Sequence, residues 1–253
     1  ARVGALQYRF AHAFVRQTLY DELSAARRLR LHQQVARVLE QQYANRLEEH
    51  AAELAEHYSQ STDAADLTKA VQYGEVAAQR ATSVYAYGEA VRLLRQALDV
   101  QEVLAPDGQD RLCSLLLELG EAMLFAGDLR AIVDDIAPRA LRLATDLGDA
   151  GRGSRACLLA LEALRRFGSA AQVSTPEYAA WVDRLDQLAP PRSVYRLRAD
   201  TERAASLMFR GQLAAAWELR VRTLALARTL GDPAALAFAA YTFVGLWARP
   251  VER

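Results

Sequence analysis

Apolar residues recur along most of the chain at the spacing of an α-helix that is buried along one face. After residue 108 this stripe reads Leu112, Leu115, Leu116, Leu119 and Met123, and Gly127 ends it. Positions three and four apart lie on one side of a helix, so the spacing predicts an amphipathic helix packed on its neighbours. The same period begins near His12 and predicts roughly a dozen helices with short connections. Gln7–Phe10, which alternates polar and aromatic residues, is the one segment that favours a strand.

Glycine followed by aspartate marks the ends of two predicted helices. Gly127-Asp128 and Gly148-Asp149 each follow an apolar stripe. Glycine readily takes the positive φ that ends a helix, and an aspartate side chain can cap the next one. Pro138 lies inside the stripe between these two turns, where it predicts a kink or a local break.

The turns recur with a fixed period. Tyr87, Leu129 and Leu213 each follow a turn, and they are 42 and 84 residues apart. The segment from 143 to 149 is echoed by residues 226 to 232, with five of seven residues identical. Helix pairs repeated every 20–50 residues stack into a solenoid, because one pair alone cannot bury its apolar face. We therefore predict an all-α solenoid of helix pairs with a period of about 42 residues.

The first of these turns resembles a tetratricopeptide repeat (TPR). The resemblance rests on Leu119-Gly120, Met123, Gly127-Asp128-Leu129 and Ile132. The small glycine of the family's first helix falls on Gly120, its turn on Gly127-Asp128 and its packing aromatic on Leu129. The family's period is about 34 residues, so the helices here are longer. The resemblance implies a right-handed superhelical solenoid of TPR-like helix pairs over residues 64–253, with the unit at 168–192 out of register.

The N-terminal part is similar to a junction found in bacterial STAND-class signalling ATPases. The residues that carry this resemblance are Tyr8 to Tyr20, followed by Arg27 to His32. In that class a nucleotide-binding module ends in a winged helix, which TPR-like sensor repeats follow, and some members end in a LuxR-type DNA-binding domain. The resemblance covers residues 6–104. It implies a winged-helix remnant at 1–23, linker helices at 24–63, and an upstream module that holds ATP or ADP.

His12 is the candidate cofactor-binding residue. With the apolar pair Phe14-Val15 and Arg16 after it, His12 resembles the histidine of the family's Met-His-Asp motif, which senses the nucleotide phosphate. Ala11 and Ala13 stand at the flanking positions. The other interpretation is a histidine held by local hydrogen bonds at the boundary between winged helix and repeats. The sequence has no Gly-x-x-x-x-Gly-Lys-Ser/Thr loop, so we expect no cofactor bound by this chain alone.

Composition narrows the range of partners. The 253 residues include 31 basic and 31 acidic side chains, so the formal net charge is zero. Without a basic excess we expect neither direct nucleic-acid binding nor a membrane surface. Cys113 and Cys157 fall in apolar stripes, which predicts buried thiols in a reducing, cytoplasmic protein.

Other candidate chemistry has a simpler structural interpretation. His50, Glu53 and His57 share a helix face, and Glu49 could join them in a metal site, but their order matches no metal motif, so we favour a structural role and expect no metal. Gly148, Gly151 and Gly153 follow a helix rather than a strand, which favours a helix turn over a phosphate cradle. We find no catalytic constellation and expect that the chain is not an enzyme.

The last predicted helix carries no charge from Ala234 to Trp247. A helix that is apolar on every side needs cover on every side. Residues 234–248 could therefore support self-association or pack on a further repeat, or the helix is exposed by truncation, which we favour.

These observations predict a non-catalytic sensor or scaffold region of a multidomain signalling ATPase or transcriptional regulator. A protein partner or a small inducer would bind the concave face of the solenoid and control the nucleotide-dependent switch through neighbouring domains. The alternative is a stand-alone TPR adaptor that binds a peptide or partner protein. A catalytic helical protein would need converging polar groups that the sequence does not reveal.

Overall fold

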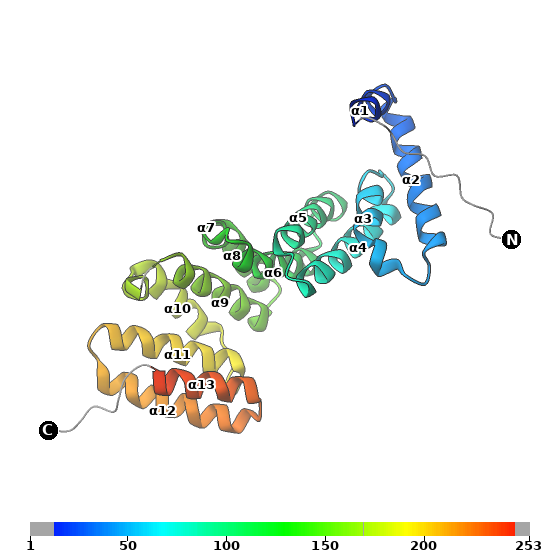
Figure 1. Cartoon of the computed structure of the whole chain (residues 1–253). Helices are drawn as coiled ribbons and strands as arrows, with labels where there is room; N and C mark the ends of the chain where they lie inside the picture. The colour runs from blue at the N-terminus through cyan, green and yellow to red at the C-terminus, as the bar shows by residue number, and fades with distance from the viewer. Residues whose placement is uncertain (1–12, 169, 246–253) are drawn as a thin grey trace.

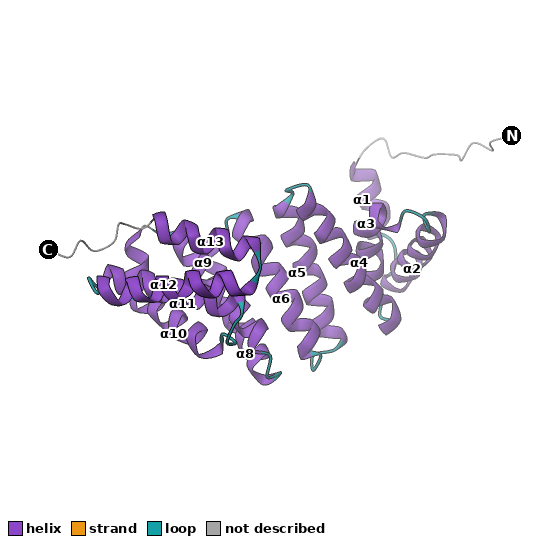
Figure 2. Ribbon diagram, turned by 90° about the horizontal axis from the view of Figure 1, so that it is seen from below, coloured by secondary structure: helices purple, strands orange, loops and turns teal. Residues whose placement is uncertain are grey.

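The computed structural model describes residues 13–168 and 170–245, and every regular element within them is a helix (Figures 1 and 2). In chain order these are α1 (Ala13–Asp21), α2 (Ala25–Gln42), η1 (Leu47–His50), α3 (Ala51–Ser59), α4 (Ala64–Ser83), α5 (Tyr87–Leu104), α6 (Gln109–Ala126), α7 (Leu129–Ala131), η2 (Ile132–Ile136), α8 (Ala137–Asp146), α9 (Ala150–Phe167), η3 (Ala170–Ser174), α10 (Pro176–Leu188), α11 (Val194–Phe209), α12 (Leu213–Leu230) and α13 (Pro233–Gly245). The strand expected at 7–10 lies outside the described residues.

The helices form stacked pairs, as the period predicts. The first helices of successive pairs, α4, α6, α9, α11 and α13, begin 45, 41, 44 and 39 residues apart. Tyr87, Leu129 and Leu213 are each the first residue of a second helix. Figure 1 shows the pairs following one another in an elongated stack, with α1 and α2 at its N-terminal end. The all-α solenoid with a period of about 42 residues is therefore confirmed.

Two of the glycine turns form as predicted. Gly148 and Gly231 have φ of 67° and 66°. The Oδ1 atom of the following aspartate accepts a hydrogen bond from the backbone N–H of Arg152 at 2.9 Å in the first turn and of Ala234 at 2.8 Å in the second. These contacts satisfy free donors at the start of α9 and α13.

The turn at Gly127 is different. Gly127 has φ of 99° and ends α6, but the predicted cap by Asp128 is wrong. Its Oδ2 atom instead accepts a hydrogen bond from Arg95 Nη2 at 2.9 Å, which links the turn to α5. Leu129 is half-buried and packs against the core.

Pro138 produces a local break of an unexpected kind. It lies in the first turn of α8, where its missing N–H costs no hydrogen bond. The preceding residues Ile132–Ile136 form a π-helical turn, in which the N–H of Ala137 donates to the carbonyl oxygen of Ile132. The wide turn keeps α7 and α8 nearly continuous as the second helix of their pair.

The central pairs share one apolar core. Gly120 allows close packing of α6 and α9, because a Cβ at this position would lie 2.9 Å from Leu159 Cδ1 and 3.3 Å from Ile136 Cγ2. Cys113 and Cys157 are buried free thiols, as predicted, and burial raises the pKa of Cys157 to about 12. The thiols therefore serve packing rather than chemistry.

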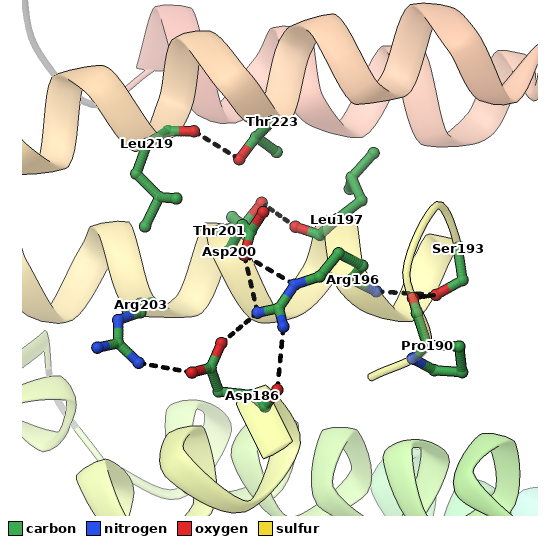
Figure 3. Close-up of polar contacts among 10 residues, drawn as sticks. All are labelled: Asp186, Pro190, Ser193, Arg196, Leu197, Asp200, Thr201, Arg203, Leu219 and Thr223. Carbon is green, nitrogen blue, oxygen red and sulfur yellow. Dashed lines mark hydrogen bonds and ion pairs between the residues drawn. The ribbon is translucent and has the colours of Figure 1, made fainter. Parts of the chain in front are cut away.

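Ion pairs hold α10 in register, although the sequence suggested that residues 168–192 leave it. Arg196 of α11 donates to the Asp186 carboxylate of α10 and, at 3.0 Å, to its carbonyl oxygen. Arg196 also pairs with Asp200, and Arg203 donates to Asp186 at 2.7 Å (Figure 3). Asp186 therefore fixes the shorter helix α10 to the next pair.

Polar side chains join α2 to the rest of the stack. Glu40 accepts hydrogen bonds from the Tyr58 and Tyr73 hydroxyls at 2.8 and 2.7 Å and from Lys69 Nζ at 2.7 Å. Burial acts to raise the pKa of Glu40, but these three donors outweigh it and leave the pKa below its ordinary value. Only Ala36 is buried among the side chains of α2, so hydrogen bonds and ion pairs carry much of this junction.

The apolar residues of α1 and α2 lie largely at the surface. Phe14 is 87% exposed, and Val15, Leu19 and Val38 are exposed as well. The predicted helix is present, but the rest of the described chain does not cover its apolar face. The domain boundaries expected after residues 23 and 63 stay predictions.

No helix in the described residues is long and apolar enough to cross a membrane.

Candidate ligand-binding groove

Two neighbouring hollows lie on the surface formed by the first helices of successive pairs. One, of about 470 Å³, is bounded by α4, α5 and α6. The other, of about 300 Å³, is bounded by α6, α9 and α11. Glu121 and Leu124 line both hollows, so the two are continuous, and we call them together the groove.

The first hollow has an apolar floor and an aromatic wall. Leu94, Ala122 and Leu124 line it, and the Tyr87 ring stacks on Phe125 with 4.7 Å between ring centroids. Phe125 is 55% exposed. Apolar surface that stays open to solvent beside polar groups suits an apolar side chain of a ligand.

The turn next to this wall carries backbone strain. Tyr85 has φ of 60°, a conformation that costs a residue with a Cβ about 1–2 kcal/mol. Its side chain is 79% exposed, and its ring meets Tyr87 edge to face with 6.2 Å between centroids. Gly127 and Gly211 take positive φ in the corresponding turns after α6 and α11, so Tyr85 takes the place of a glycine.

Basic and acidic residues line the second hollow. Glu121 pairs with Arg155 at 2.6 Å, and Glu162 pairs with Arg166 at 2.9 Å. Arg166 also donates to the carbonyl oxygen of Leu124 at 3.0 Å, and its guanidinium lies 4.7 Å from the centroid of the Phe125 ring. These contacts tie the ends of α6 and α9 together along the groove.

Below the second hollow, α9, α10 and α11 share a buried polar cluster. Glu202 is buried, accepts a hydrogen bond from the Tyr178 hydroxyl and pairs with Arg165 at 2.9 Å. Burial and the nearby Glu202 charge raise the pKa of Tyr178, so its hydroxyl stays a donor at neutral pH. The cluster supports the wall of the groove and exposes no reactive group.

Two charged residues of the groove have no partner of opposite charge in contact. Glu118 makes no hydrogen bond or ion pair with any described residue, and its pKa is raised, mainly by burial. Arg198 has a buried Nε atom without a hydrogen-bond partner. Its guanidinium lies 4.2 Å from the centroid of the Phe238 ring, and burial lowers its pKa.

The residues that the sequence singled out lie elsewhere. His12 is outside the described residues, so its proposed contact with a nucleotide is not tested. His50 stacks on Tyr43 and faces Glu53, whereas His57 Nδ1 lies 2.9 Å from His32 Nδ1, so the two predicted metal ligands have different neighbours. No three His, Cys, Asp or Glu side chains in the described part of the chain are placed to hold a metal.

The glycines at 148–153 form a helix turn, as expected. Gly148 takes the positive φ that ends the preceding helix, and Gly153 packs within 3.1 Å of Leu188 Cδ1 at its Cβ position. Neither glycine faces the groove.

A periodic signal for this surface is present in the sequence but was missed. Phe125, Phe167 and Phe209 are 42 residues apart, each lies at or next to the end of a first helix, and they are 55%, 56% and 46% exposed. Apolar residues at exactly the repeat period are normally assigned to the core. Their position just before the turns places these three outside it.

Comparisons with known proteins support the fold. No family model and no curated protein sequence matches the chain. The solved structure of BtubC (BKLC) from P. vanneervenii is similar, with a TM-score of 0.56, 16% identity, and coverage of 88% of this chain and 82% of that chain. A candidate kinesin light chain of Podosopora anserina, with nearly identical TPR-like repeats, is 18% identical over 81% of this chain and 98% of that chain, with a TM-score of 0.48. With its stacked helix pairs, the chain has the fold of a TPR-like helical-repeat solenoid, which suits a scaffold for protein interactions.

Proposed function

We propose that this chain is a non-catalytic interaction scaffold that binds an extended segment of a partner protein in the groove along α4, α6, α9 and α11. The continuity of the two hollows, through Glu121 and Leu124, is the observation that carries the proposal. Stacked repeats add binding surface without adding reactive groups. An aromatic wall next to charged side chains is typical of a surface that recognises a peptide.

A displayed peptide library tests this proposal directly. The whole chain is used to select twelve-residue peptides, and the selection is repeated with the variant Phe125→Ala. We expect enriched peptides with the native chain and a loss of about tenfold or more in their affinity for the variant, because the wall of the first hollow is removed.

Phe209→Ala is the matched control. Phe209 is exposed to a similar extent and lies at the same place in a later repeat, but it lines neither hollow. Peptides that bind both variants like the native chain would show that the groove is not the binding site.

We further propose that the scaffold is the sensor region of a STAND-class signalling ATPase or transcriptional regulator. The resemblance of residues 8–32 supports this, and so does the exposed apolar face of α1 and α2, which a neighbouring module could cover. In this proposal the upstream module holds ATP or ADP, His12 contacts its phosphate, and partner or inducer binding in the groove shifts the nucleotide-dependent state.

The gene decides between this proposal and a stand-alone adaptor. We expect the reading frame to continue upstream into a Gly-x-x-x-x-Gly-Lys-Ser/Thr loop. A complete open reading frame without that loop would reject the ATPase and leave the adaptor. The isolated chain should hydrolyse no ATP, and turnover that one substitution in the groove abolishes would reject the non-catalytic scaffold.

A further inference from the structure

Six charged side chains line the groove, and they divide into two kinds. Four of them form ion pairs, namely Glu121 with Arg155 and Glu162 with Arg166. The other two, Glu118 and Arg198, have opposite signs and no hydrogen bond or ion pair with any described residue. Glu118 lines the first hollow and Arg198 lines the second, so each hollow has one charge left to bind something else.

An unpaired charge that is partly buried is a source of binding free energy. Neither Glu118 nor Arg198 is fully exposed, so each has lost part of its hydration without gaining a counter-ion. A ligand group of opposite charge restores that interaction. The four paired residues offer no such gain, because a ligand would first have to displace their present partner.

We propose that the groove selects its ligand by a pair of opposite charges: a lysine or arginine of the bound segment against Glu118, and an aspartate or glutamate of the same segment against Arg198. An apolar residue of the segment fills the space beside Tyr87 and Phe125. This inference rests on the proposed function, since it specifies the ligand of the same groove.

The position of the two charges also fixes the direction of the bound segment. Glu118 belongs to α6 and Arg198 to α11, and they lie in different hollows, so an extended peptide is the ligand that reaches both. Its basic residue lies toward α4 and its acidic residue toward α11. A segment that binds in reverse would bring like charges together at both places, which is unfavourable.

The test compares peptides selected by the native chain with those selected by Glu118→Gln and by Arg198→Gln. The native chain should enrich peptides with one basic and one acidic residue at a constant separation. Glu118→Gln should lose only the preference for the basic residue, and Arg198→Gln only the preference for the acidic one. For one native-selected peptide, each variant should weaken binding by about tenfold, as expected for a lost charged hydrogen bond.

Two control variants keep the test specific. Arg184→Gln removes an arginine that also lies over an aromatic ring, Trp181 at 4.7 Å, and Glu218→Gln removes an exposed carboxylate of α12. Neither residue lines the groove, so both should select the same peptides as the native chain. Circular dichroism and the melting temperature of each variant show that it is folded.

The outcomes separate this inference from the proposed function. Enriched peptides without a charge pattern, or with a pattern that neither groove variant changes, would overturn the inference and leave the scaffold. If the native chain enriches no peptide over Phe125→Ala, both proposals fail.

Discussion

The body of the solenoid and its N-terminal junction are held together in different ways. From α4 to α9 the helices meet through buried leucine, alanine and isoleucine side chains in one continuous core. Where α2 meets α3 and α4, the contacts are a small apolar cluster around Ala36 and three polar networks, centred on Glu40, Asp66 and the pair His32–His57. Apolar burial hardly changes with pH, whereas hydrogen bonds to titratable groups do. The junction is therefore the part of the molecule whose geometry solution conditions can change.

The largest effect is expected from a cavity in the body. Leu116 is fully buried, so Leu116→Ala should lower the free energy of unfolding by about 2–5 kcal/mol. Because the core is continuous, the loss should appear in the main transition of a urea titration. A loss confined to one pair, with the main transition unchanged, would show that the body does not unfold as a unit.

A change at the junction should be smaller and local. Glu40→Gln keeps the shape of the side chain but removes the charge that accepts from Tyr58, Tyr73 and Lys69, and should cost about 1–2 kcal/mol. We expect faster hydrogen exchange in α2 and unchanged exchange in α6. Equal acceleration in both helices would contradict the contrast between body and junction.

Acidification should act at the junction before it acts on the body. Burial and the nearby His32 lower the pKa of His57, against the opposite effect of Glu56 and Glu53. The released ring therefore binds a proton more readily than the docked ring, so the contact weakens as the pH falls below about 6.5, the ordinary histidine value. A second proton on the pair would also leave two N–H donors facing each other where Nδ1 and Nδ1 are 2.9 Å apart.

Hydrogen exchange at pH 7.5 and 5.5, corrected for the intrinsic rates, measures this effect. Opening of α2 should increase several-fold at the lower pH, and His57→Asn should remove the dependence on pH. In the body, burial raises the pKa of Glu118, so this carboxyl favours the folded state at low pH rather than opposing it. The same pH effect in α6 as in α2 would refute the difference.

The smallest effects concern two turns of the body. Nothing lies within 4 Å of a Cβ at Gly127, so Gly127→Ala should cost about 1 kcal/mol through its positive φ alone. Tyr85→Gly should change stability in the opposite sense by about 0.5 kcal/mol, since the relief of strain exceeds the added chain entropy. Thermal unfolding of both variants gives the signs, and a stabilised Gly127→Ala protein would reject the argument from strain.

The sequence predicts the body well because its signals are local. The spacing of apolar residues and the glycine–aspartate turns at 148 and 231 depend on neighbours in the chain, and both are present in the structure. Asp128 shows where local reasoning fails, because Arg95 of α5 takes the side chain that was expected to cap a helix. Pro138 shows it too, since the chain accommodates the proline with a wide turn rather than a kink.

The groove could not be predicted in the same way. Glu118 and Arg198 are 80 residues apart, and neither stands out from its surroundings in the sequence. Their importance comes from the sideways stacking of α6, α9 and α11, and from the pairing of every other charge in the groove. Only three-dimensional packing shows which charges are left without a partner.

The recurrence of Phe125, Phe167 and Phe209 gives the protein an internal reference for mutational studies. These residues occupy matching places in units of one length, as copies of an ancestral segment would. The place of Arg198 is held by Ala156 one unit earlier, and the place of Glu118 by Ala160 one unit later. Exchanging residues between units can therefore move a recognition charge along the solenoid while the architecture stays the same, so that the chain serves as its own template for redesign.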